Sequence, residues 1–155
     1  MTPIGSLERR LLQISVALAG IVPVWVGVAG ALGGSTVVGS THSLDLDSHF
    51  RYLSGLLAAI GLLYWSTIPR IEVMSGRFAL LTLIVVCGGF ARALGMLFVG
   101  PPGGGMIFGL VMELVVTPAL YLWQGRVARR MMMAQVVLKP VGAPGAEHRT
   151  ARNNA

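Results

Sequence analysis

The stretch LLQISVALAGIVPVWVGVAGAL, residues 11–32, decides the fold, because it runs for 22 residues without a charged side chain. At about 1.5 Å per residue, a helix of this length measures about 33 Å and can cross a bilayer hydrocarbon core of about 30 Å. The whole chain has the same character: 54% of its 155 residues are apolar, 12% are charged, and its mean hydropathy is +0.74. Soluble domains are about 45 to 50% apolar and about 25% charged. We therefore expect an all-α membrane protein.

Three more apolar stretches are long enough to cross a membrane. They lie at about residues 51–68, 78–99 and 106–124. The third contains Arg92 and the fourth contains Glu113. A central arginine costs about 2.5 to 3.5 kcal/mol on insertion, but each Leu, Ile, Phe or Val returns about 0.3 to 0.6 kcal/mol, so a span with a dozen such residues still inserts. The sequence predicts an up-down bundle of four transmembrane helices within residues 1–130, and the turn at residues 100–105, rich in glycine and proline, predicts a tight hairpin.

The basic residues predict the orientation. Ten of the twelve Lys and Arg fall at the two ends of the chain and in the connection between the second and third spans: Arg9, Arg10, Arg70, Arg77, Arg126, Arg129, Arg130, Lys139, Arg149 and Arg152. The other two connections contain no Lys or Arg, so we expect both termini to be cytoplasmic in a multi-pass protein of the bacterial inner membrane. This topology explains the net charge of +6 without nucleic acid as a partner.

The two ends of the chain leave alternatives open. Residues 131–155 are predicted to form a basic, largely disordered cytoplasmic tail, because after Pro140 they lack the large apolar residues that offset ordering entropy. Residues 126–139 could instead extend the fourth helix along an anionic inner leaflet. The other end of the chain resembles a signal peptide, because the charged Glu8-Arg9-Arg10 precedes an apolar run that contains Ala17-Leu-Ala19, a possible cleavage site. The apolar run continues to Leu32, however, and is about twice as long as the apolar core of a usual signal peptide.

Two ionisable residues lie within the predicted spans and should be partners. The midpoint of the last hairpin falls between Pro102 and Gly103, and Arg92 and Glu113 each lie 10.5 positions from it. Antiparallel helices joined there bring the two residues to one depth, about 10 Å below the helix ends. Since a charge in lipid normally faces the bundle interior and has a partner, we predict an Arg92–Glu113 ion pair. Pro118, one turn further along the same span, predicts a kink.

A wider polar layer is expected around this pair. The same counting across the connection between the second and third spans places Arg51 within about 4.5 Å of the depth of Arg92. Just above it in the first outer loop lie Asp45, Asp47 and His49. Glycines on the same faces predict close helix packing beside the layer: Gly55, Gly88, Gly89 and Gly95. Together these residues predict an outward-facing vestibule of mixed charge.

Four sequence words support a family assignment. In order, these are His49-Phe-Arg-Tyr-Leu-Ser-Gly55, Ile68-Pro-Arg70, Gly88-Gly-Phe-Ala-Arg92 and Glu113-Leu-Val-Val-Thr-Pro118. Over about residues 5–125 the chain resembles the bacterial membrane family called domain of unknown function 4345. The resemblance implies a small four-helix inner-membrane protein and no activity. It also implies that Arg51, Gly55, Arg92 and Glu113 match polar and glycine positions of the family.

The function remains open between classes. The layer predicts binding of a small ligand or lipid headgroup, whereas the glycine-rich faces suit a homo-oligomer or an assembly partner of other membrane proteins. Transport of a solute or protons is a further alternative. Enzymatic activity has only Glu113 with His49 as a candidate acid/base pair, so we expect no catalytic residues. A single cysteine and three scattered histidines lead us to expect no metal and no cofactor.

Overall fold

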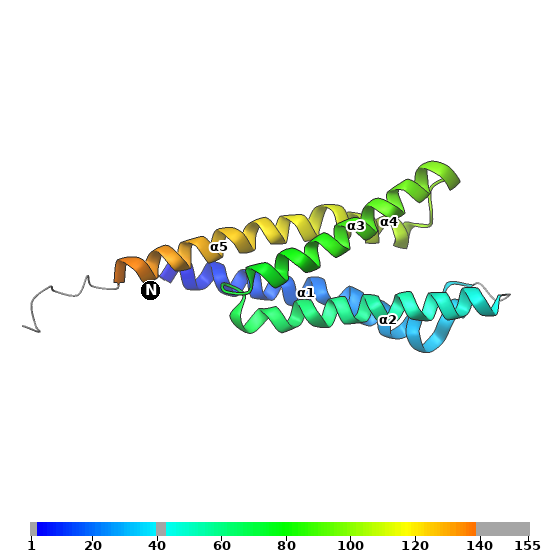
Figure 1. Ribbon diagram of the computed structural model, residues 1–155, viewed down its shortest axis with the longest axis horizontal. Coiled ribbons are helices and arrows are strands. Elements are labelled where there is room, and N and C mark those ends of the chain that lie inside the picture. The colour runs from blue at the N-terminus through cyan, green and yellow to red at the C-terminus, as the bar shows by residue number, and fades with distance from the viewer. Residues whose placement is uncertain (1–2, 40–42, 139–155) are drawn as a thin grey trace, which may run out of the picture.

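A computed structural model describes residues 3–39 and 43–138, and within these ranges all regular secondary structure is helical (Figure 1). The α-helices are α1 (Pro3–Gly33), α2 (Leu44–Thr67), α3 (Ser75–Val99), α4 (Gly104–Val111) and α5 (Thr117–Leu138), of which only α4 is short. Short 3-10 turns follow α1 (Gly34–Val38) and α2 (Ile68–Arg70), and a π-helical turn (Met112–Val116) joins α4 to α5 without a break.

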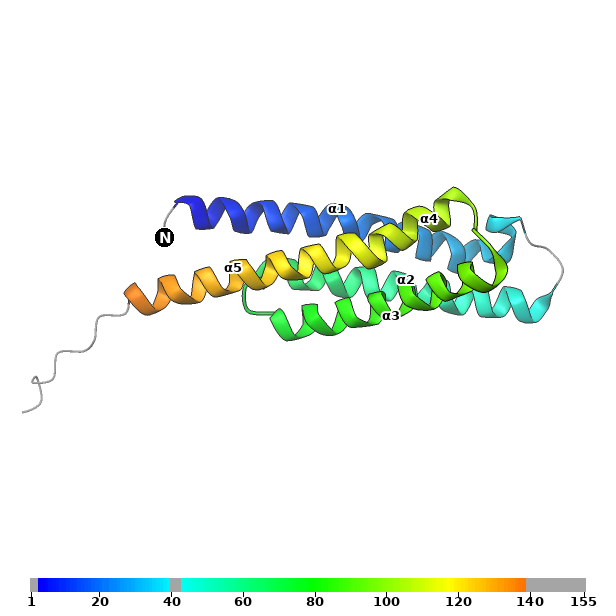
Figure 2. The same cartoon turned by 90° about the horizontal axis from the view of Figure 1, so that it is seen from above.

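Four helical segments are long and apolar enough to cross a membrane, as the sequence predicts. They are Gly5–Val38, Leu44–Arg70, Ser75–Val99 and Gly104–Ala134. The start of α1 and the end of α5 lie at one end of the molecule, which we call the terminal end, and the connections after α1 and α3 lie at the other, the hairpin end (Figures 1 and 2). The helix α5 continues to Leu138, so residues 131–138 are helical rather than part of a disordered tail. The remainder of the predicted tail, residues 139–155, lies outside the described residues.

Small residues let α1 and α2 approach closely. A Cβ atom at Gly27 would lie 2.4 Å from the Ala58 backbone nitrogen, and one at Gly30 would lie 2.3 Å from the Ser54 hydroxyl. Two turns nearer the terminal end, the Trp65 indole covers Gly20 and donates its Nε1–H to the Ala17 carbonyl at 3.0 Å. Since these glycines lie on one face of α1, that face matches the small residues of α2, and the two helices form a tight pair.

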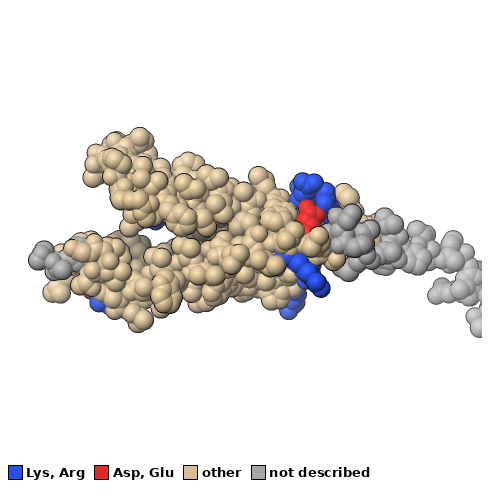
Figure 3. Space-filling view, turned by 180° about the vertical axis from the view of Figure 1, so that it is seen from behind, with Lys and Arg blue, Asp and Glu red and all other residues tan. Residues whose placement is uncertain are grey.

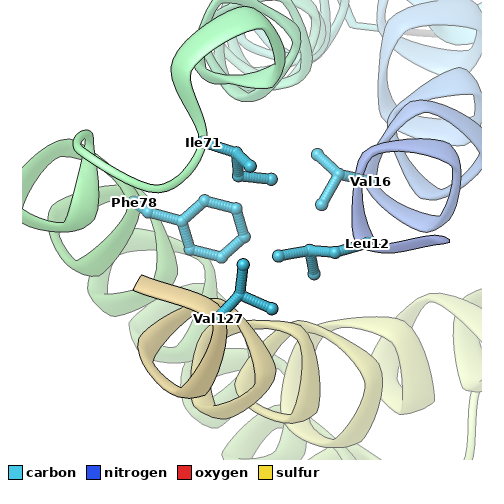
Figure 4. Close-up of a cluster of buried hydrophobic side chains, with 5 residues drawn as sticks. All are labelled: Leu12, Val16, Ile71, Phe78 and Val127. Carbon is cyan, nitrogen blue, oxygen red and sulfur yellow. The ribbon is translucent and has the colours of Figure 1, made fainter. Parts of the chain in front are cut away.

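The apolar core lies toward the terminal end, where all four spans meet. Leu12 and Val16 from α1, Ile71 from the connection after α2, Phe78 from α3 and Val127 from α5 form a cluster of fully or almost fully buried side chains (Figure 4). Gln124 lies close to this cluster. Its Nε2 donates to the Ile71 carbonyl at 2.7 Å and to the Ser75 hydroxyl at 2.8 Å, which fixes the connection between α2 and α3 against α5.

Toward the hairpin end the bundle divides into two halves. The pair α1 and α2 diverges from the half that contains α3, α4 and the first turns of α5 (Figure 1). The space-filling view shows a hollow between the two halves at this end (Figure 3). Tyr64 on α2 and Thr82 on α3, whose hydroxyls lie 3.1 Å apart, form a polar link between the halves on the terminal side of the hollow.

The glycine predictions are correct at one position of four. A Cβ atom at Gly89 would lie 2.7 Å from Leu114 Cδ2 and 3.0 Å from Glu113 Cβ, so α3 packs closely on the fourth span there. At Gly55, Gly88 and Gly95 a Cβ atom would meet nothing within 4 Å. The prediction that these three pack against a neighbouring helix is wrong within the chain, because they lie on faces that the other described helices do not cover.

Candidate functional site

The predicted ion pair between Arg92 and Glu113 is present. Arg92 on α3 donates from Nη2 to Oε1 of Glu113 in the π-helical turn, at 2.9 Å. The side chains are 33% and 17% exposed, so the pair is neither fully buried nor a free surface contact. Equal distance from the 100–105 turn brings these residues to one depth, because antiparallel helices keep sequence register on both sides of a tight hairpin.

Two glycines provide the space for the pair. Gly89 lies one turn before Arg92 and lets the backbone that carries Glu113 approach α3. Gly109 lies one turn before Glu113, and a Cβ atom there would be 3.4 Å from Arg92 Nη1. The guanidinium therefore lies against the bare surface of α4. A larger side chain at Gly109 would compete for the space that the guanidinium occupies.

Glu113 lies in an irregular part of the fourth span. The π-helical turn covers Met112–Val116, and the Thr117 amide donates to the Met112 carbonyl across five residues. The Thr117 hydroxyl donates to the same carbonyl at 2.8 Å. Pro118 follows and has no amide hydrogen for the Leu114 carbonyl, so the regular hydrogen-bond pattern has to change here. Single π-helical turns within α-helices often occur at functional sites.

The ion pair does not use all of its hydrogen-bonding capacity. Oε2 of Glu113 is buried and accepts no hydrogen bond within the described part of the chain. Arg92 Nη1 donates to the Met106 sulfur at 2.9 Å, and a thioether is a weak acceptor. A buried carboxylate oxygen without a donor normally costs free energy, so such a group needs an explanation. The ion pair therefore retains one acceptor without a donor and one donor that is bound only weakly.

Arg51 and Asp47 form a second cluster at the hairpin end of α1 and α2. Arg51 Nε lies 2.7 Å from Asp47 Oδ2, and its Nη1 donates to the carbonyls of Ala31 and Leu32 at 2.9 and 2.7 Å. Asp47 Oδ1 accepts from the amide of Ser35 at 2.7 Å and from its hydroxyl at 3.1 Å. Arg51 thus satisfies carbonyls at the end of α1, where the helix provides no donors, and the cluster fastens α1 to α2.

The structure therefore divides the predicted polar layer into two clusters. Within the described ranges, no hydrogen bond or ion pair joins Arg51 or Asp47 to Arg92 or Glu113. Asp45 is exposed near the start of α2, and His49, also exposed, has its ring 6.5 Å from that of Tyr52. Counting along the hairpins predicts depth but not the direction in which a side chain leaves its helix, so residues at similar depth can belong to separate clusters.

A third set of polar contacts lies at the terminal end and was not predicted. Arg9 pairs with Glu72 at 2.8 Å, and Arg130 pairs with Glu8 at 2.5 Å. Arginine side chains gather at this end beside acidic ones (Figure 3). The sequence contains a signal for these pairs, because two acidic residues stand among seven arginines in the corresponding segments, but the predicted topology uses only the basic residues. In the described residues, no group of three or more His, Cys, Asp or Glu is placed to hold a metal ion.

A sequence model of one family, described as a domain of unknown function (DUF4345), matches residues 11–124. The chain belongs to this family. The match confirms the resemblance seen in the sequence words, and the matched DUF4345 region contains both polar clusters of the hairpin end. No curated protein and no solved structure matches the chain.

Proposed function

We propose that the four helices span a bacterial inner membrane with both termini in the cytoplasm. The described residues of the terminal end contain seven arginines and two glutamates, whereas the hairpin end contains only Arg51 and Arg92 among its basic residues. This asymmetry supports a cytoplasmic terminal end. Reporter fusions after Arg130 and after Gly39 are expected to report opposite compartments. A periplasmic signal after Arg130 would overturn this orientation.

We infer that the protein binds a small ligand or a lipid headgroup at the Arg92–Glu113 pair. The observation that carries this inference is the buried Oε2 of Glu113, which receives no hydrogen bond from any described residue, while the neighbouring guanidinium uses one of its donors on a methionine sulfur. The π-helical turn and the hollow at the hairpin end support it. Arg51 and Asp47 act as a structural fastening of α1 to α2 and are not part of the proposed binding site.

The inference is tested on molecules that co-purify with the protein. Full-length protein is extracted in detergent, and bound species are identified by mass spectrometry in the parent and in the Arg92→Leu/Glu113→Leu double variant. The matched control is Asp47→Asn, which weakens the other cluster of the hairpin end. We expect a species that the parent and the control retain and the double variant loses. Identical bound species in all three proteins would mean that the pair serves only to lock α3 to the fourth span.

Transport and enzymatic activity are supported less well. Leu12, Val16, Ile71, Phe78 and Val127 fill the terminal end with apolar side chains, which gives a solute no polar path to that side. His49 is exposed on α2, and no hydrogen bond or ion pair between described residues joins it to Glu113, so the two do not form an acid/base pair. A role as an assembly partner needs only packing surfaces, and it would be favoured if the double variant retained every property of the parent.

A further inference from the structure

The hydrogen-bonding groups left over at the Arg92–Glu113 pair specify the chemistry of a ligand. We propose that the site takes a phospholipid whose headgroup combines a primary ammonium with a phosphate, as in an ethanolamine phospholipid. This rests on the proposed binding function and names its substrate class. The ammonium donates to Glu113 Oε2, and a phosphate oxygen accepts from Arg92 Nη1 in place of the Met106 sulfur.

The carboxylate determines the positive half of the ligand. Oε1 of Glu113 already accepts from Arg92, and Oε2 is left without a donor. A ligand that satisfies Oε2 must bring an N–H or O–H group. A primary ammonium brings a charged donor, and hydrogen bonds between charged groups are about twice as strong as neutral ones. A choline headgroup is cationic but has no N–H group, so it cannot satisfy this oxygen.

The guanidinium determines the negative half. Arginine matches phosphate geometry because its planar fork presents several donors at once. Met106 now occupies one donor direction, but its side chain is flexible and the residue is 43% exposed, so it can turn away without breaking a strong contact. A phosphate oxygen in its place replaces a weak neutral acceptor with a charged one. Because the two charged groups are held 2.9 Å apart, they suit a ligand whose own charges are close together.

The location favours a membrane lipid over a free solute. Arg92 lies seven residues before the end of α3, about 10 Å below it along the axis. The helix end beyond it is apolar, with Leu97, Phe98 and Val99 each at least 80% exposed. One turn on either side of Arg92, Gly88 and Gly95 leave open space beside α3. A headgroup at the pair would therefore be surrounded by apolar surface, which a lipid's acyl chains can cover and a free solute cannot.

The test is a methylation series on the parent protein. Detergent-purified full-length protein is titrated with dioleoyl-phosphatidylethanolamine, its N-methyl and N,N-dimethyl forms, and dioleoyl-phosphatidylcholine, and binding is followed by native mass spectrometry. The first three headgroups keep an N–H group and the last has none. We expect similar affinities for these three and a drop of about 10- to 100-fold at the last methylation, since one charge-assisted hydrogen bond is lost. A steady decline across the series would show selection by headgroup size and overturn the assignment.

Four comparisons separate the remaining possibilities. Glu113→Gln should abolish the drop in affinity between the N,N-dimethyl lipid and phosphatidylcholine. Asp47→Asn should retain this drop, because Asp47 belongs to the other cluster. Equal binding of phosphatidylethanolamine and phosphatidylglycerol by the parent would overturn the ammonium assignment but leave the proposed lipid binding intact. If free phosphoethanolamine binds the parent as tightly as phosphatidylethanolamine does, the proposal that the ligand is a lipid is wrong. If no probe binds more tightly to the parent than to Arg92→Leu/Glu113→Leu, both the headgroup assignment and the proposed binding function fail.

Discussion

Removing the two partners of the Arg92–Glu113 pair should not have equal effects. Breaking a buried ion pair costs about 3 to 5 kcal/mol, whereas an exposed pair is worth about 0.2 to 1 kcal/mol. With side chains 33% and 17% exposed, this pair lies between these cases. Arg92→Leu leaves a short, mostly covered carboxylate without its described donor, and we expect it to lower the free energy of unfolding by about 3 kcal/mol.

Glu113→Leu should be the milder change. The arginine that remains has a long side chain, which already extends along α4 past Gly109 to Met106. It can move its charge toward the hairpin end of the bundle, as long basic side chains do near membrane interfaces. We therefore expect a loss of about 1 to 2 kcal/mol. The double variant, with an apolar residue at both positions, should lie within about 1 kcal/mol of the parent, since paired apolar replacement of an ion pair is often nearly neutral.

The assay is a double-mutant cycle by reversible unfolding in mixed micelles, followed by far-UV circular dichroism. The cycle measures the coupling between the two side chains separately from their other contacts. Additive losses in the double variant would refute direct pairing of Arg92 and Glu113. If Arg92→Leu lowers the free energy of unfolding less than Glu113→Leu does, the expectation that the arginine relocates its charge more easily than the glutamate is wrong. The carboxylate would then have another donor in the Arg92→Leu variant.

Other substitutions test the packing and the second cluster by the same unfolding measurement. Gly89→Ala should lower the free energy of unfolding by about 1 to 3 kcal/mol, because the new Cβ atom meets Leu114 and Glu113. The adjacent Gly88→Ala should be neutral or should stabilise the protein by up to about 1 kcal/mol. Equal effects of the two substitutions would mean that α3 is rotated differently about its axis. Phe78→Ala should cost about 3 to 5 kcal/mol, since Phe78 is fully buried in the core. Arg51→Leu should cost about 1 kcal/mol and leave ligand binding at Arg92 unchanged, and a loss of binding would show that the two clusters act together.

The features that were predictable depend on position along one dimension. The length of an apolar run predicts a span, and equal distance from a tight hairpin predicts that two residues share a depth. Both arguments succeed without knowledge of how the helices are rotated. The four spans and the Arg92–Glu113 contact therefore follow from the sequence, and the cost of an unpaired charge in lipid provides the reason for the contact.

The features that were missed depend on rotation and on alternatives that are close in energy. Arg51 and Arg92 both lie toward the hairpin end, but Arg51 turns to the end of α1, where unsatisfied carbonyls and Asp47 are nearer partners. Gly88 and Gly89 are adjacent in sequence, yet only one faces a neighbouring helix. Pro118 predicts an interruption of the fourth span, but the sequence does not determine whether this interruption takes the form of a kink or of a π-helical turn.

The division of charge between the two helix pairs bears on whether the two polar clusters depend on each other. The terminal core around Phe78 is the part where all four spans are packed together. On the hairpin side of the Tyr64–Thr82 link, no hydrogen bond or ion pair between described residues joins one helix pair to the other. Arg51 and Asp47 neutralise each other beside the end of α1, and Arg92 and Glu113 do so between α3 and the fourth span. A substitution in one cluster should therefore leave the contacts of the other cluster intact.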